Sequence, residues 1–409
     1  FVLAEIGGVW FLNEKMNLPE SRIGAANWVL QCSILTFMVN LISVPYNAAI
    51  IAHERMQAFA YISIIEVVLK LLIVYILVIF SFDKLKLYGI LLLAVACVIR
   101  IAYGIYCKRN FKECTYHFTF NKALLKEMMG FAGWNFIGAF AGVLRDQGVN
   151  IVINLFCGPV INAARAIAFQ VNVAVNGFAT NFMTAINPQI TKSYAAGDYE
   201  HMWKLVFNGT RYSFFLLAVF MLPLCFNIDF ILSLWLKKIP AYTNIFVILL
   251  LANVLAESYS TYLITVLLAT GKIALYQASV GTILLLNVPL SYLVFQWGFP
   301  PVSFLIVSIV LTIMALIMRL WLLKKMLRFS VLSFLKQVVL KTVSASLLIC
   351  LVNCAIYLLL PDMYGKRIIF LLSTSLLSIL LTYLTGLNNQ EKILILQQLK
   401  KRITSLIHS

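Results

Sequence analysis

The sequence predicts an all-α, polytopic membrane protein, and three observations support this fold class. Apolar residues make up 62% of the 409-residue chain and charged residues only 11%. The mean hydropathy is +0.94. Long apolar runs recur along the chain, and runs of about 20 residues are what a helix needs to cross a bilayer core. A barrel would instead show strands of about ten residues with alternating polarity.

We expect eleven complete membrane spans, preceded by a partial one. Residues 1–12 are apolar but too few to cross the bilayer, so we interpret them as the end of a helix whose beginning is missing. This segment has neither the basic region nor the cleavage motif of a signal peptide, so we do not interpret it as one. The complete spans are predicted at 27–51, 60–80, 88–107, 131–156, 164–190, 211–234, 244–269, 275–297, 302–323, 340–360 and 367–387.

The net charge of +17 would suggest nucleic-acid binding in a soluble protein. Here the distribution of charge indicates membrane topology instead. One alternating set of loops, including 108–128, 324–338 and the tail 388–409, carries most of the Lys and Arg, which predicts that this set and the C-terminus lie in the cytoplasm. The tail is predicted to form a basic amphipathic helix on the inner leaflet. We therefore expect membrane lipids, and no nucleic acid, as partners.

No catalytic or cofactor motif is recognisable. The four histidines lie in predicted loops or the tail, and Walker, dinucleotide-binding and HExxH patterns are absent from the sequence. The eight cysteines show no CxxC spacing, and we interpret them as small core residues. We therefore expect a protein that is not an enzyme and has no cofactor or metal.

Polar residues inside the spans are the informative feature, because ionisable groups in hydrocarbon are costly and face protein or water. Arg145 and Asp146 lie in the middle of the span 131–156. Helical spacing places a stripe of polar and small residues on one face of this span, beside Arg145. Its members are Asn135, Gly138, Gly142, Asp146, Asn150 and Asn154.

The next span repeats this pattern, with Arg165, Asn172, Asn176, Thr180, Thr184 and Asn187. Such residues either join helices by hydrogen bonds or line a watery cavity. The number of polar positions favours a cavity.

Other charges in spans are the Glu66–Lys70 pair, which can simply neutralise itself, and Arg100 and Glu257, which have no such neighbour and are cavity candidates. Together with the polar faces of the spans 131–156 and 164–190, Arg100 and Glu257 predict a mildly cationic cavity suited to a diphosphate or an acidic sugar.

A coupling proton or sodium ion could use Asp146 or Glu257, although the sequence selects neither ion.

Pro45 and Pro289 lie inside apolar runs, where a proline kinks the helix. Each kink is either a hinge or a static bend. A faint repeat relates HERMQAFAYIS at 53–63 to TGKIALYQAS at 270–279. Duplication and chance similarity both account for it.

Several segments resemble Wzx-type O-antigen and polysaccharide flippases of the multidrug/oligosaccharidyl-lipid/polysaccharide exporter superfamily. The resemblance runs from residue 1 to about 390. It is most specific in NAARAIAFQVN and NPQITKSYAAGD, and it extends to SVPYNAAIIAHERMQAFAYISIIEVVLKL and FAGWNFIGAF.

This resemblance implies a two-lobe helical bundle of the kind found in multidrug and toxic-compound exporters, with two six-helix lobes and two further helices. On that plan, residues 1–107 would be the remnant of the first lobe, 108–128 a cytoplasmic linker, 129–323 the second lobe, 324–387 the two additional helices and 388–409 the cytoplasmic tail.

The implied activity is transport of undecaprenyl-diphosphate-linked oligosaccharide across the bacterial cytoplasmic membrane by alternating access. Two alternatives stay open. A drug or metabolite exporter of the same superfamily would need acidic residues for cationic substrates, and a membrane-embedded glycan polymerase or acyltransferase would need a long outer loop with Arg or His clusters. The longest predicted outer loop is 13–26.

Overall fold

The computed structural model describes residues 5, 7–10, 20–80, 82–114, 120–236, 238–359 and 364–386, and these form helices joined by short turns, with no strand among them. Within this part of the chain, nine helices are long and apolar enough to cross a membrane. The prediction of a multi-pass, all-helical membrane protein is therefore confirmed at this level. The predicted tail 388–409 and most of the partial span 1–12 lie outside the described residues.

The chain divides into two compact units, Phe1–Phe120 and Asn121–Ser409. The division falls inside the segment 108–128 that we predicted as a linker. Each unit is described separately below.

The first unit contains three long helices, α2 (Glu20–Ala52), α3 (Met56–Ile79) and α4 (Lys84–Asn110), followed by the short turn η1 (Lys112–Cys114). Asp83 caps α4 by accepting a hydrogen bond from the Leu85 backbone N–H. Pro45 stays inside α2. A small core that includes Ile50, Ile62, Ile99 and Tyr103 holds the three helices together.

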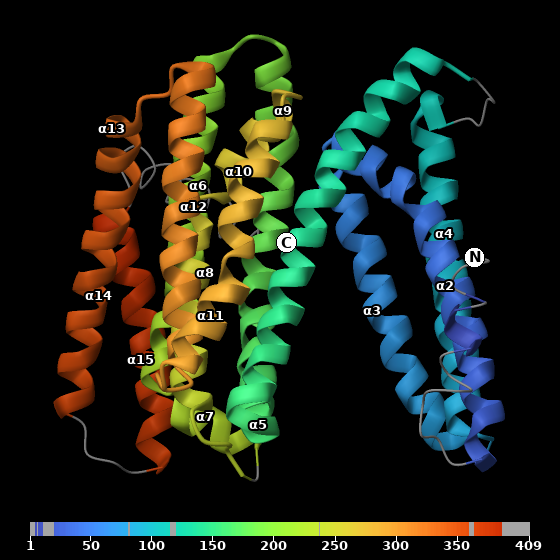
Figure 1. Cartoon of the computed structure of the whole chain (residues 1–409), viewed down its shortest axis with the longest axis horizontal. Helices are drawn as coiled ribbons and strands as arrows, with labels where there is room; N and C mark the ends of the chain where they lie inside the picture. The colour runs from blue at the N-terminus through green and yellow to red at the C-terminus, as the bar shows by residue number, and fades with distance from the viewer. Residues whose placement is uncertain are drawn as a thin grey trace, which may run out of the picture. The chain divides into compact units, whose positions relative to one another are not determined.

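The second unit begins with α5 (Lys122–Ala195), which is a helical hairpin rather than one rod. The break lies at Gly158, which has φ 78° and ψ 178°, a backbone conformation essentially restricted to glycine. Pro159 then starts the second leg, where its missing N–H costs nothing. The legs 122–157 and 159–195 correspond to the predicted spans 131–156 and 164–190, and Figure 1 shows the ribbon turning back at the label α5.

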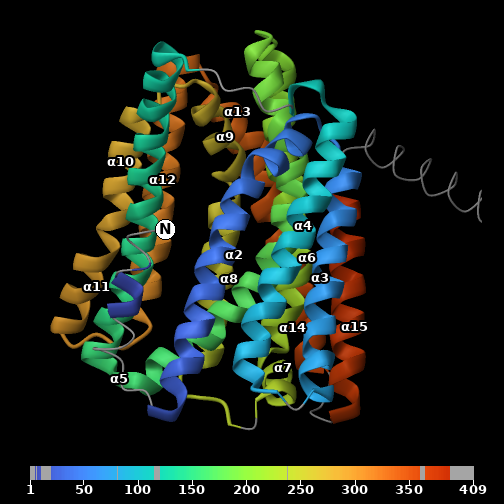
Figure 2. The same cartoon turned by 90° about the vertical axis from the view of Figure 1, so that its right-hand side faces the viewer.

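The remaining helices of this unit run lengthwise beside one another, as the second view also shows (Figure 2). They are α6 (Tyr199–Phe226), α7 (Ile228–Trp235), α8 (Thr243–Ser258), α9 (Thr261–Ala269), α10 (Ala274–Leu285), α11 (Asn287–Gln296), α12 (Ser303–Leu327), α13 (Val331–Phe334), the π-helical turn η2 (Leu335–Val339), α14 (Leu340–Leu359), α15 (Tyr364–Leu381) and the π-helical turn η3 (Thr382–Gly386).

Three predicted spans are each built from two helices with a break between them, namely α6–α7, α8–α9 and α10–α11. The last break is the one that Pro289 predicted, because Pro289 lies in the first turn of α11. The break between α8 and α9 has no proline or glycine to announce it.

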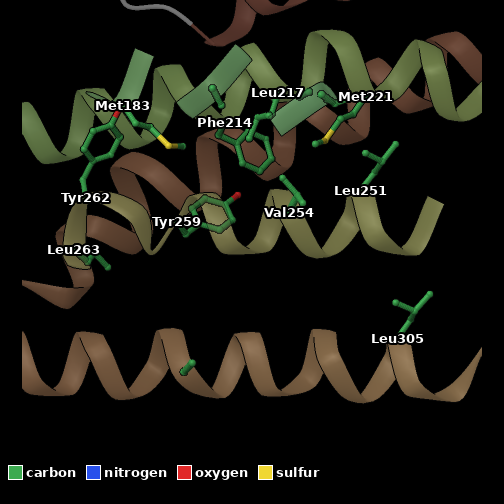
Figure 3. Packing of buried hydrophobic residues seen from close by; sticks show 14 of the residues in the cluster. Met183, Phe214, Leu217, Met221, Leu251, Val254, Tyr259, Tyr262, Leu263 and Leu305 are labelled. Carbon is green, nitrogen blue, oxygen red and sulfur yellow. The ribbon is translucent and has the colours of Figure 1, made fainter. Parts of the chain in front are cut away.

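The core of the second unit is a single cluster in which side chains of α5, α6, α8, α9 and α12 interlock. Figure 3 shows Met183, Phe214, Leu217, Tyr259 and Tyr262 packed against one another in it. Many large apolar side chains are instead exposed on the outside of the helices, for example Val310, Ile317 and Leu351. A surface of this kind needs lipid around it.

Candidate functional site

The α5 hairpin brings together four of the predicted site residues. Arg145 and Asp146 lie on the first leg, where the Arg145 Nε donates to Asp146 Oδ1 over 3.0 Å. Arg165 crosses from the second leg, with Nη1 donating to Asn150 Oδ1 at 3.1 Å and Nη2 to the Asp146 backbone carbonyl at 3.3 Å. This fold-back contact exists because the turn at Gly158 places residue 165 opposite residues 146 and 150.

The cluster holds more positive than negative charge. It contains two guanidinium groups and one carboxylate, and that carboxylate is already engaged by Arg145. The side chains of Arg145 and Asp146 keep 24% and 46% of their surface exposed, so the pair is reachable from outside the packed unit. Guanidinium groups bind phosphate oxygens through two parallel hydrogen bonds, and this arrangement is suited to an anionic group.

The second leg also carries an open groove of about 440 Å³, whose lining begins at Val173, about two helical turns beyond Arg165. Asn176, Gly177, Thr180 and Asn181 provide its polar and small lining. The Thr180 hydroxyl donates back to the Asn176 carbonyl at 3.0 Å, so its oxygen remains an acceptor. Asn172, one turn earlier, has a buried Oδ1 with no hydrogen-bond partner among the described residues.

Some of the predicted polar and small residues contact neighbouring helices. The Asn135 Oδ1 accepts from Gln277 Nε2 of α10 at 3.4 Å. A Cβ at Gly138 would clash with the Gln277 side chain. Asn187 accepts from Thr265 of α9 at 2.9 Å. These positions make interhelical hydrogen bonds, and lining a cavity stays a prediction for them. Asn154 is exposed and takes no part in the four-residue cluster.

The described hydrogen bonds and ion pair of the cluster do not include Glu257 or Arg100. Glu257 is exposed on α8 and forms no ion pair with any described residue. Arg100 belongs to the first unit, where its guanidinium lies 3.9 Å above the centre of the Tyr46 ring. Such a cation–π contact gives Arg100 a structural partner. A role in transport stays a prediction for both residues.

Sequence reasoning missed Asn162. Its Oδ1 is buried without a partner among the described residues, one turn before Arg165. The signal was present in NAARAIAFQVN, where the first asparagine lies three residues before the arginine. Helical spacing alone would have placed both on one face.

Within the described part of the chain, no group of three His, Cys, Asp or Glu side chains could hold a metal ion. No protein-family model matches the chain, and the comparison with curated proteins finds no match either.

Proposed function

We propose that this protein is a flippase that moves undecaprenyl-diphosphate-linked oligosaccharide across the bacterial cytoplasmic membrane by alternating access, for polysaccharide or O-antigen synthesis. The observation that carries the proposal is the Arg145–Asp146–Asn150–Arg165 cluster, with its excess positive charge inside a membrane-spanning hairpin. Charge inside a membrane-spanning segment is costly and marks substrate or ion pathways. The sequence resemblance supplies the substrate class.

The groove along Asn176 and Thr180 extends the surface available to a substrate. In this proposal the arginines bind the diphosphate, and the amides and hydroxyls of the groove accept hydrogen bonds from the neighbouring sugar. Asp146 keeps Arg145 in place through their 3.0 Å contact. The resting protein thus offers a pre-formed anion site, which reduces the ordering needed when substrate binds.

The test is a flipping assay with fluorescent diphosphate-linked oligosaccharide in proteoliposomes. Arg145→Gln is the more informative variant, because a partly exposed ion pair contributes little to stability. We expect initial rates roughly tenfold or more below the parent, consistent with loss of a charge-assisted hydrogen bond worth about 1.5–3 kcal/mol. Arg165→Gln should have a similar effect on transport and should also lower the melting temperature, since Arg165 joins the two legs.

Arg328→Gln is the matched control, because Arg328 is exposed at the end of α12 and lies outside the cluster. It should transport at the parent rate. Parent-like flipping by both the Arg145 and the Arg165 variants would remove the cluster from the mechanism.

One observation favours a second candidate, an exporter of cationic drugs or metabolites. Glu257 presents an exposed carboxylate on α8 without an ion pair among the described residues. Drug susceptibility of cells that overproduce the parent or Glu257→Gln separates the two functions. Protection that depends on Glu257 would favour the exporter.

A further inference from the structure

A second polar pocket lies within the first unit. It has a volume of about 300 Å³ and is lined by residues of α2, α3 and α4, which puts it at the lower end of the range for small-ligand sites. From α2 it receives Thr36, Asn40, Ser43 and Asn47, which recur every three or four residues and therefore share one face. A polar face on an otherwise apolar helix needs an explanation.

The other walls differ in character. On α3, Lys70 Nζ donates to Glu66 Oε1 at 2.6 Å, and both residues line the pocket. Tyr103 of α4 also lines the pocket, and only 6% of its surface is exposed. The rest of the α4 wall is apolar, formed by Leu92, Val95, Ala96 and Ile99.

The polar groups of the pocket have spare hydrogen-bonding capacity. Asn47 Oδ1 is buried and has no partner among the described residues. The hydroxyls of Thr36 and Ser43 donate to the backbone carbonyls of Cys32 and Val39, so their oxygens remain free to accept. Buried polar groups in folded proteins are nearly always paired. The Asn47 Oδ1 can therefore accept a hydrogen bond from a ligand or an ordered water.

The mixture of groups restricts the chemistry of that ligand. The Glu66–Lys70 pair makes the formal charge of the pocket zero. A metal cation would meet the Lys70 ammonium, and an anion would meet the Glu66 carboxylate. Amide and ammonium N–H groups donate, whereas amide, carboxylate and hydroxyl oxygens accept. A hydroxyl group both donates and accepts, so a molecule with several hydroxyls satisfies both kinds of group at once.

We propose that the pocket between α2, α3 and α4 binds a neutral polyhydroxylated ring, that is, a single uncharged sugar residue or a polyol of that size. In this arrangement Asn47 and Tyr103 form hydrogen bonds with ring hydroxyls, and the apolar α4 wall contacts the C–H face of the ring. The ring belongs either to the glycan of a lipid-linked substrate or to a free sugar. Only the first source rests on the proposed function.

The test measures binding of free sugars to the detergent-purified full chain by saturation-transfer NMR. We expect a signal for neutral hexose and N-acetylhexosamine and a weaker one for hexuronate, because the net-neutral Glu66–Lys70 pair does not offset the cost of desolvating a carboxylate. Asn47→Leu should weaken neutral-sugar binding roughly tenfold, the effect of removing buried hydrogen bonds, and Tyr103→Phe should weaken it severalfold. Tyr75→Phe is the matched control, since Tyr75 is exposed on α3 outside the pocket.

Glu66→Gln tests the charge argument without removing a hydrogen-bonding group. It leaves the Lys70 ammonium unpaired, so hexuronate should then bind more tightly than hexose, the reverse of the parent. No sugar signal from the parent, or an unchanged signal from both Asn47→Leu and Tyr103→Phe, would overturn the proposal.

Two further measurements separate this proposal from the proposed function. Competition by lipid-linked oligosaccharide against the free sugar identifies the glycan of the substrate as the source, whereas a free-sugar signal that this lipid does not reduce identifies a soluble ligand. Arg145→Gln should lose flipping and keep the sugar signal. A failed flipping assay with an intact, Asn47-dependent signal would reject the transport function and leave the sugar site standing.

Discussion

At the scale of single residues, Gly158 has the largest structural effect, because it creates the hairpin on which the candidate site depends. Its φ of 78° with ψ of 178° is strained for any residue with a Cβ, although the space around it is open. We therefore expect Gly158→Ala to destabilise the protein by about 1–3 kcal/mol through the backbone alone. The measurement is the melting temperature in detergent.

Gly142→Ala is the control for Gly158→Ala. Gly142 lies in the first leg of the same hairpin, has ordinary helical geometry and also faces open space. Alanine there should be neutral or stabilising by about 0.5–1 kcal/mol, because it lowers the entropy of the unfolded chain. Equal melting temperatures for the two variants would show that Gly158 carries no strain.

The residue scale also shows how far the candidate site could be predicted. The sequence identified Arg145, Asp146, Asn150 and Arg165 because polar groups in apolar spans stand out by composition. It did not separate them from Asn135 and Asn187, which have the same chemistry and spacing. What distinguishes those two is a partner on α10 or α9, namely Gln277 or Thr265. Tertiary contacts of this kind leave no mark on a single helix pattern.

At the scale of elements, the break between α8 and α9 is held by side chains from other helices. Tyr259 OH contacts Thr342 Oγ1 at 2.7 Å, and Tyr262 OH contacts Ser213 Oγ at 2.8 Å. The Arg319 Nη1 donates to Ser260 Oγ at 2.9 Å. We predicted 244–269 as one apolar span, and its length and position agree with the paired helices. The interruption was not predictable, because its cause lies in α6, α12 and α14.

The Tyr262–Ser213 contact can be tested by a double-mutant cycle. Ser213 and Tyr262 are fully buried, so Tyr262→Phe leaves one hydroxyl without its partner and should cost about 1–3 kcal/mol. Ser213→Ala should cost a similar amount. The double variant should be less destabilised than the sum of the two, since it leaves neither group unpaired. Additive losses would mean that the two hydroxyls do not stabilise the break together.

At the scale of the whole molecule, hydropathy predicted the fold class because a membrane leaves few alternatives to apolar helices. Nine helices among the described residues are long and apolar enough to cross a membrane, with Lys122–Gly177 of α5 taken as one of them, and the count of eleven spans stays a prediction. Hydropathy does not report how two compact units are arranged, since lipid-facing and helix-facing positions are equally apolar in a bilayer. The orientation in the membrane comes from charge alone.

That orientation gives the last prediction, which uses a matched pair of exposed alanines in the second unit. Ala196 lies in the turn before α6 and Ala241 in the turn before α8, and α6–α7 lies between the two turns, so they should face opposite sides of the membrane. The charge distribution predicts that 108–128 and 324–338 are cytoplasmic, so Ala196 should be cytoplasmic and Ala241 should lie outside. In intact cells, a membrane-impermeant maleimide should label Ala241→Cys above the background of the parent's own cysteines. Ala196→Cys should react only after permeabilisation. The reverse pattern would invert the topology, and labelling of both in intact cells would contradict a membrane crossing between them.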